Sequence, residues 1–148
     1  MARHTVGGVA TTVGTATLPL VSIYNTATIR FQLREVHIFN TTATGSFTVA
    51  LCRLSSTGTP GVGLTEVSLS GAAAVAGSTA FAGHTLAPTL ADLGYRKRMG
   101  PAVGDGVIWT FNGAAGVSSV LGAANGIGLY VPVGTGQIMD YCLVWDED

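Results

Sequence analysis

IGLYVPVGTGQIMDYCLVWDED, residues 127–148, contains two runs of strand-forming residues on either side of a glycine-rich turn. The runs cover residues 127–133 and 137–145, and the turn covers residues 134–136. A strand near the end of a chain must be paired within a sheet, because an unpaired edge invites aggregation. The pattern therefore predicts that these residues are structural and that the fold closes with them.

The composition indicates one domain with few charges on its surface. The chain has 148 residues, of which 10% are charged, against ~25% in typical soluble domains. Its mean hydropathy is +0.47, yet no apolar run approaches the ~20 residues that a membrane-spanning helix needs. The net charge of −1 argues against a general nucleic-acid binder, which carries a basic face. We therefore expect no membrane and no nucleic acid as partner, and we expect protein partners to cover the uncharged surface.

Apolar and polar residues alternate along most of the chain, which is typical of strands. Besides the two closing runs, strands are expected at residues 17–25, 27–40, 47–54, 64–69, 107–111 and, more weakly, 117–121. Residues 55–63 are expected to form a loop, and residues 71–83 fit either a loop or a poor edge strand. The only helical turn is expected at residues 85–93, with Pro88 near its start and Gly94 as the stop signal.

Short strand runs separated by Gly and Thr turns predict an all-β fold. We expect a jelly-roll-like β-sandwich of about eight antiparallel strands, with an immunoglobulin-like sandwich as the alternative. Residues 1–16, which are rich in Gly and Thr, are predicted to be a flexible N-terminal arm that orders on a partner. Residues 17–148 are predicted to form the single β-sandwich domain.

The run at residues 27–40 changes phase in its middle. Apolar residues occupy odd positions before Arg34 and even positions after Glu35. A strand cannot change phase in this way without gaining or losing one residue of register. We therefore predict a β-bulge or a sharp bend at these two residues, in a strand that passes from one sheet region to another.

Clusters of charge indicate where a partner binds. Arg96, Lys97 and Arg98 follow Tyr95, and the chain ends in the acidic residues 146–148. A short basic run is usually a solvated loop, and its functional interpretation is a patch that docks on an acidic partner. On that hypothesis, neighbouring subunits pair head to tail through the basic and acidic clusters. The predicted partner-binding residues, chosen for charge and exposure, are Arg3, His4, Tyr95, Arg96, Lys97 and Arg98.

The sequence offers little for catalysis. It contains no nucleophile elbow, no phosphate loop and no pair of histidines at metal-ligand spacing. Glu35 and His37 lie two apart on one strand face, which indicates a solvent-facing stripe or two groups that touch one ligand. Cys52 and Cys142 match no zinc pattern, so we expect two buried thiols, with a single cross-sheet disulfide left open. We expect no enzyme activity, no cofactor and no metal.

The chain resembles small structural proteins of tailed bacteriophages over two segments. The first is REVHIFNTTATGSFTVALCRLSSTGTPGVGLTEVSL, residues 34–69. The second joins LGYRKRMGPAVGDGVIWTF, residues 93–111, to NGIGLYVPVGTGQIMDYCLVWDED, residues 125–148. The shared signs are an N-T-T-A hairpin, a V-I-W-T-F strand and a closing strand that ends in W-D-E. Together the segments cover more than half of the chain.

The resemblance implies a capsid decoration (cement) protein on the exterior of a phage virion. Such proteins are small β-rich folds, often jelly-roll-like, that assemble as trimers or other small oligomers on the capsid lattice. The implied partners are the major capsid protein and further copies of this chain, with a trimer favoured. The implied location is the virion surface, after assembly in the host cytoplasm, and the N-terminus carries no secretion signal. The resemblance brings no catalytic residues.

A receptor- or glycan-binding module of a phage tail or fibre is the alternative function. Jelly rolls often serve in this way, and aromatic side chains stack on sugars. Trp109 and Trp145 are the candidates, although their apolar strand contexts favour core positions. A hydrolase is disfavoured by the missing acids and bases. A shell-building capsid subunit is disfavoured by the small size and by the absence of a long predicted helix.

Overall fold

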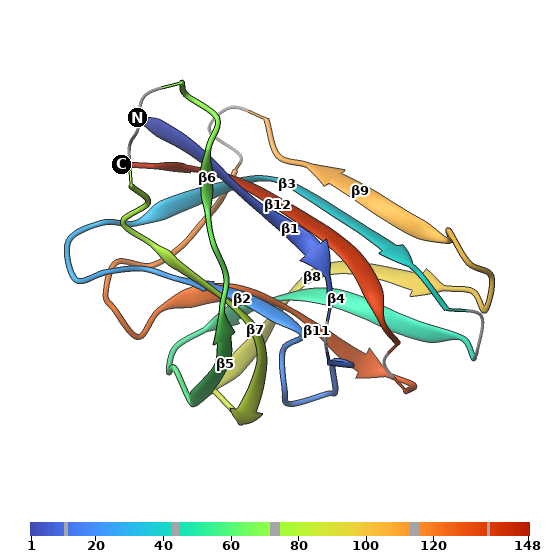
Figure 1. Cartoon of the computed structure of the whole chain (residues 1–148). Coiled ribbons are helices and arrows are strands. Elements are labelled where there is room, and N and C mark those ends of the chain that lie inside the picture. Colours follow the sequence, from blue (N-terminus) through green and yellow to red (C-terminus); the bar gives the residue numbers. More distant parts are fainter. Residues whose placement is uncertain (11, 43–44, 72–74, 113–115, 136) are drawn as a thin grey trace.

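The computed structural model describes residues 1–10, 12–42, 45–71, 75–112, 116–135 and 137–148. Within these residues the chain forms twelve strands and no helix, in two antiparallel sheets packed face to face (Figure 1). The first sheet contains β1 (Ala2–Val9), β3 (Phe31–Asn40), β6 (Val67–Ser68), β9 (Gly106–Thr110), β10 (Val117–Ser118) and β12 (Met139–Glu147). The second contains β2 (Val21–Tyr24), β4 (Phe47–Leu54), β5 (Thr59–Gly63), β7 (Thr79–Leu86), β8 (Leu90–Met99) and β11 (Gly126–Val133).

Eight of these strands pair in a nested order. β1 pairs with β12, β2 with β11, β3 with β9, and β4 with β8, so the outermost strands of the chain meet first and the middle ones last. This is the order of a long hairpin rolled into two facing four-stranded sheets, which defines a jelly roll. The predicted jelly-roll-like sandwich is confirmed, and it replaces the immunoglobulin-like alternative. β5, β6, β7 and β10 extend the sheets beyond the eight.

The closing strand is central, as the sequence predicts. β12 lies between β1 and β3, and the two ends of the chain lie close together at one end of the sandwich (Figure 1). Its inner face buries Tyr141, Leu143 and Trp145, and the Trp145 side chain is completely buried. β11 belongs to the second sheet, so the turn between the two closing strands carries the chain from one sheet to the other.

The bulge predicted in β3 is confirmed. Val144 of β12 pairs with Glu35, whereas Trp145 pairs with Leu33, so Arg34 is an extra residue in the ladder. Because of this residue, apolar side chains on both sides of the bulge point into the same core. The predicted passage between sheet regions is wrong, since β3 pairs with β12 along its whole length.

Three other predictions are corrected. Residues 2–9 of the predicted flexible arm form β1, which pairs with β12 on one side and β6 on the other. The predicted helical turn at 85–93 is instead the end of β7 and the start of β8, and the predicted loop at 55–63 contains β5. In each case a strand far away in sequence supplies the hydrogen bonds that local patterns cannot reveal. The predicted loop or poor edge strand at 71–83 and the N-T-T-A hairpin extend outside the described residues, but residues 79–83 belong to β7, which lies between β5 and β2 and is therefore not an edge strand.

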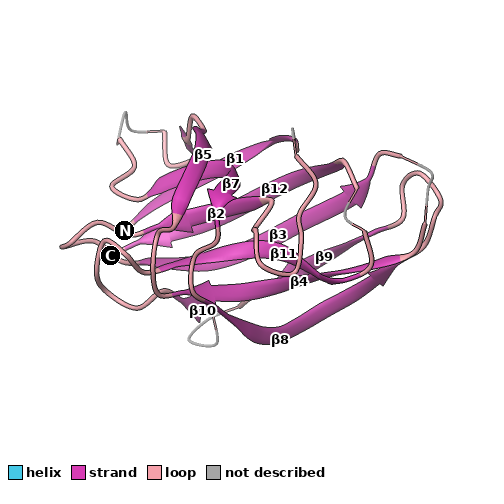
Figure 2. Cartoon of the chain, turned by 90° about the horizontal axis from the view of Figure 1, so that it is seen from below, coloured by secondary structure: helices cyan, strands magenta, loops and turns pink. Residues whose placement is uncertain are grey.

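The two sheets differ in what covers their outer faces. On the second sheet a second apolar cluster includes Tyr24, Cys52 and Tyr130, all buried although they lie outside the main core. Loops run across this face (Figure 2), and the Tyr24 hydroxyl donates hydrogen bonds to the carbonyls of Ser56 and Thr57. The outer face of the first sheet has no such cluster among the described residues, and several of its side chains are exposed.

Candidate interaction surfaces

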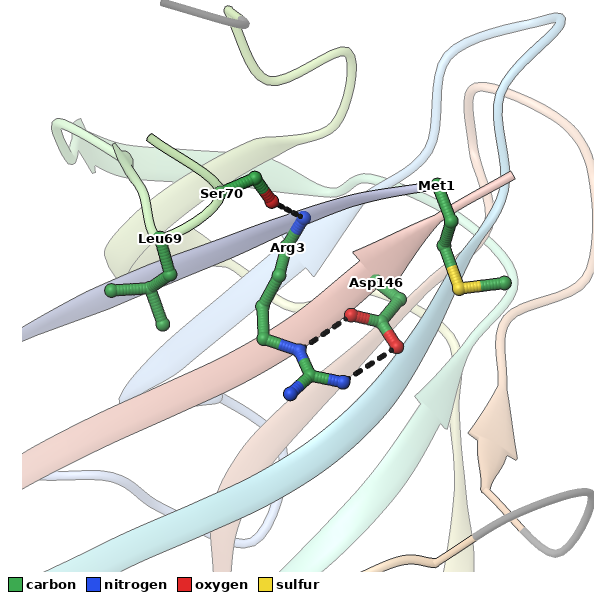
Figure 3. Close-up of a pocket in the computed structure, with 5 residues that line it drawn as sticks. All are labelled: Met1, Arg3, Leu69, Ser70 and Asp146. Carbon is green, nitrogen blue, oxygen red and sulfur yellow. Dashed lines mark hydrogen bonds and ion pairs between the residues drawn. The ribbon is translucent and has the colours of Figure 1, made fainter. Parts of the chain in front are cut away.

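An ion-pair network joins the first and last strands at one end of the first sheet. Asp146 accepts hydrogen bonds from Arg3 Nε at 2.7 Å and Arg3 Nη2 at 3.1 Å (Figure 3), and from Arg34 Nε at 2.6 Å. The Asp146 side chain is buried, whereas that of Arg3 is 52% exposed. The hydrogen bonds from Arg3, reinforced by Arg34, hold the pKa of Asp146 below its usual value despite burial. The β3 bulge places Arg34 where it reaches this carboxylate.

A shallow hollow surrounds the predicted contact residue Arg3. Met1, Leu69, Ser70 and Asp146 line it together with Arg3, and Ser70 Oγ accepts a hydrogen bond from the Arg3 backbone (Figure 3). Met1 and Leu69 are exposed. The hollow therefore combines a neutralised guanidinium with apolar walls, which suits a protein contact better than a charged small molecule.

His4 is not the exposed contact residue that the sequence predicts. The side chain is 1% exposed and stacks on Trp145, with ring centroids 5.9 Å apart. Its Nε2 lies 3.6 Å from Glu147 Oε2, and neither ring nitrogen has a hydrogen-bond partner among the described residues. Successive side chains of β1 point to opposite faces of the sheet, so Arg3 points outward and His4 points inward.

Glu147 is a buried anchor for the chain between β6 and β7. Its carboxylate accepts hydrogen bonds from the backbone N–H of Gly77 at 2.8 Å and of Ser78 at 2.9 Å. The Ser78 hydroxyl and Trp145 Nε1 donate two more. Burial alone raises the pKa of Glu147, but these hydrogen bonds together hold it below the usual value. Asp146 and Glu147 thus have partners within the chain, whereas Asp148 is exposed, and the head-to-tail pairing through residues 146–148 stays a prediction.

The other predicted contact residues lie on β8, the edge strand of the second sheet. Three residues of β8, Leu93 to Tyr95, oppose Leu51 of β4, which bends the strand. Tyr95 leans from this bend toward β9 and meets Trp109 and Phe111 edge to face, with centroids 6.4 and 5.0 Å apart. The Tyr95 side chain is 40% exposed, so the bend in β8 presents one aromatic ring to solvent.

The basic run on β8 is partly neutralised. Arg96 Nη2 lies 2.8 Å from Asp92 Oδ2, and Lys97 Nζ lies 3.7 Å from Asp105 Oδ1. Asp92 also accepts a hydrogen bond from the Tyr130 hydroxyl, which helps to hold the bend in place. Within the described residues Arg98 has no ion pair, and it is exposed. We name Tyr95, Arg96, Lys97 and Arg98 the β8 surface.

The structure does not bring all six predicted residues together. Arg3 lies on β1 in the first sheet, with β12 and β3 between it and β9, whereas the β8 surface lies beside β9 at the edge of the second sheet (Figure 1). The sequence identified both exposed groups by their charge. Their separation follows from the strand order, which no local pattern contains.

Sequence reasoning missed a third surface, the outer face of the first sheet. It is formed by outward-facing residues of β1, β12, β3, β6 and β9, which include Arg3, Thr5, Gly7, Val9, Asp140, Cys142, Val144, Asp146, Arg34, Glu35, His37, Phe39, Val67 and Ile108. His37 Nε2 and Glu35 Oε2 lie 3.0 Å apart on this face, so the predicted stripe forms a pair. The alternation along residues 139–147 is the signal that identifies the face.

The described residues contain no group of three or more His, Cys, Asp or Glu side chains that could hold a metal ion. Both cysteines are free thiols, Cys52 buried and Cys142 half-buried. Cys52 lies in the outer cluster of the second sheet and Cys142 on the outward side of β12 in the first sheet, so the two sulfurs lie on opposite outer faces of the sandwich and form no cross-sheet disulfide. No helix in the described part of the chain is long and apolar enough to cross a membrane.

Comparison of the chain with family models, with curated proteins and with solved structures gives no match in any of the three.

Proposed function

We propose that this protein is a structural, non-enzymatic virion protein that decorates the exterior of a tailed-bacteriophage capsid. The observation that carries the proposal is how the chain uses its charges. Asp92, Asp105 and Asp146 are paired with basic side chains, and Glu147 is buried among hydrogen-bond donors. The surface that remains displays many uncharged and apolar side chains, which is typical of a surface that partners cover.

The jelly-roll fold and the sequence resemblance support the same proposal. Jelly rolls recur in viral capsid proteins and in lectins. On this proposal the β8 surface contacts the major capsid protein, because it offers an exposed cation, Arg98, and an exposed aromatic ring, Tyr95, on one edge strand. Arg and Tyr are the side chains most often found at the energetic centre of protein interfaces.

Decoration of this kind requires binding only. A protein that binds the assembled shell, and not its separated parts, shifts the equilibrium toward assembly by mass action. Many copies that each bridge adjacent capsomers therefore oppose the pressure of packaged DNA. The protein is then located on the virion surface.

The test is the copy number of the protein on purified phage particles, measured by quantitative mass spectrometry. Many copies in a simple ratio to the major capsid protein are expected, and a handful or none would contradict decoration. Particles that lack the protein are then mixed with purified chain. Arg98→Glu combined with Tyr95→Ala is expected to reduce capsid binding at least tenfold, or about 1.4 kcal/mol. Val62→Ser, at an exposed position on β5, is the matched control.

A glycan-binding tail module is the second candidate, and the β8 bend is the observation that favours it. Tyr95 is exposed with Trp109 and Phe111 behind it, whereas Trp145 is completely buried and cannot stack on a sugar. Saturation-transfer NMR with host-surface glycans distinguishes the two functions. Transfer that Tyr95→Ala abolishes would favour the glycan-binding module.

A further inference from the structure

We propose that the outer face of the first sheet is a two-fold interface with a second copy of this chain. The face presents apolar side chains that nothing in the described chain covers. Val9, Val67 and Ile108 are 56%, 55% and 53% exposed, and Cys142 and Val144 between them are half-buried. The corresponding face of the second sheet is covered by loops, so the two outer faces of one sandwich are in different environments (Figure 2).

The charged residues on this face are arranged so that one end of the face complements the other end of the same face in an antiparallel second copy. At one end of β12, Arg3 and Arg34 both donate to the buried carboxylate of Asp146, and the Arg3 side chain is 52% exposed, so a guanidinium group is presented at this end of the face. At the other end Asp140 is exposed and has no ion pair within the described residues. Six residues separate the two ends, or ~20 Å at ~3.3 Å per residue.

The centre of the face has the same symmetry. Leu143 is midway between Asp140 and Asp146, and it points into the core. On either side of its level, Val144 pairs with Glu35 and Cys142 pairs with His37. Consider a two-fold axis that lies parallel to the sheet, perpendicular to the strands and level with Leu143. This axis exchanges the level of Val144 and Glu35 with the level of Cys142 and His37. It places Glu35 of one copy opposite His37 of the other.

The same axis brings opposite charges together at the ends of the face. It places Asp140 of one copy level with Asp146 of the other copy, where Arg3 and Arg34 also lie. Aligned sheets cross at about 30°, which moves the ends of the face sideways by a few ångströms, and arginine side chains are long enough to span this shift. One operation therefore matches the charged ends and the polar centre, and it places Val144 of one copy opposite Cys142 of the other. A face that is complementary to itself in this way points to a second copy, because an isologous interface must be self-complementary.

The size of the face sets the expected affinity. β1, β12 and β3 are eight to ten residues long and β6 and β9 are shorter, so at ~3.3 Å per residue and ~4.8 Å between strands the face covers roughly 540 Å², less than the ~800 Å² per partner of a standard interface. We therefore expect a dimer that forms at micromolar concentrations. The pair replaces the trimer that the sequence resemblance favours, and it leaves the β8 surface free for the capsid contact proposed above.

Sedimentation of the purified full-length chain over a range of concentrations tests the interface without any capsid. A monomer–dimer equilibrium is expected. Val144→Glu buries a carboxylate at the centre of the interface and is expected to weaken dimerisation at least about tenfold. Asp140→Lys reverses the unpaired end charge and is expected to weaken it about threefold to tenfold. Val62→Glu, on the edge strand β5, is the control that leaves the dimer unchanged.

The wild-type thiol gives a second measurement that needs no variant to fold. Cys142 lies one residue from the two-fold level, so its labelling by a maleimide is expected to slow as the concentration rises into the dimer range. Protein that is already labelled at Cys142 is expected to remain monomeric. A chain that stays monomeric at all concentrations, a trimer, or a dimer that tolerates both Val144→Glu and labelled Cys142 would overturn the interface. None of these results affects the capsid-binding measurement, which is made on particles.

Discussion

Arg3 Nε donates a hydrogen bond to Asp146 Oδ1 at 2.7 Å, so an ion pair joins the first strand of the sandwich to the last across 143 positions of sequence. Arg34 Nε donates to the other carboxylate oxygen at 2.6 Å. The buried carboxylate of Asp146 thus ties β1, β12 and β3 together at the end of the first sheet where both chain ends lie (Figure 1).

Asp146→Asn is expected to lower the free energy of unfolding by about 2 kcal/mol. The amide removes the negative charge that Arg3 and Arg34 share, and the cost stays below the ~3–5 kcal/mol of a fully buried pair because Arg3 is half exposed. Denaturant unfolding measures the difference. Asp140→Asn, on the same strand but exposed, is the matched control, with an expected change within about 0.5 kcal/mol. Equal effects of the two substitutions would contradict a stabilising role for the network.

Glu147→Gln is expected to lower stability at neutral pH and to have a smaller effect in acid. The pKa of Glu147 lies below its ordinary value of 4.5, so the ionised carboxylate favours the folded state. Its contribution is fully present above about pH 4.5 and is lost as the pH falls through the folded-state pKa. We expect a loss of about 2 kcal/mol near pH 7, because the amide cannot accept all four hydrogen bonds.

Unfolding curves of Glu147→Gln and the wild type between about pH 7 and pH 3 check this sign. Asp148→Asn, at the exposed last residue, is the control. A difference between the two proteins that stays constant over this pH range would show that the Glu147 carboxylate does not titrate with unfolding.

Strand positions could be predicted where one face of a strand is buried. Residues 47–54 were expected to form a strand, and β4 has these bounds because Phe47, Val49 and Leu51 alternate into the core. The bulge at Arg34 was predictable for the same reason. A phase change in the apolar pattern has only one local remedy, which is an extra residue.

The missed elements depend on partners that are distant in sequence. The Gly- and Thr-rich sequence of β1 predicts a flexible arm, because its pairing partner β12 lies more than 130 residues later in the chain. In β8, Gly94 resembles a helix stop, yet its φ of 83° serves the bend of a strand that pairs with β4. The acidic residues 146–148 look like an exposed tip for a similar reason. Asp146 has its cationic partners on β1 and β3, so its carboxylate is buried, and only Asp148 of the three is exposed.

His4→Phe is expected to stabilise the protein by about 1 kcal/mol near pH 7. Both His4 ring nitrogens are buried without hydrogen-bond partners among the described residues, and such groups lose their hydration on folding without compensation. A phenyl ring keeps the stacking on Trp145, and Glu147 retains its four other donors. Thermal and denaturant unfolding measure the change. A loss of stability would mean that the 3.6 Å approach of His4 to Glu147 is a working ion pair.

Only one of the two thiols is expected to react in the native protein at low concentration. Cys52 is completely buried on β4, and burial raises the pKa of its thiol to about 12, so almost no reactive thiolate forms. Cys142 is half-buried on the outer face of the first sheet, where its sulfur lies 3.4 Å from the Thr5 hydroxyl. A maleimide should modify one equivalent in buffer and two in denaturant, and Cys142→Ser should remove the native equivalent. Rapid modification of Cys52 in the native protein would mean that the apolar cluster around this thiol on the second sheet opens often, because Cys52 is completely buried within it.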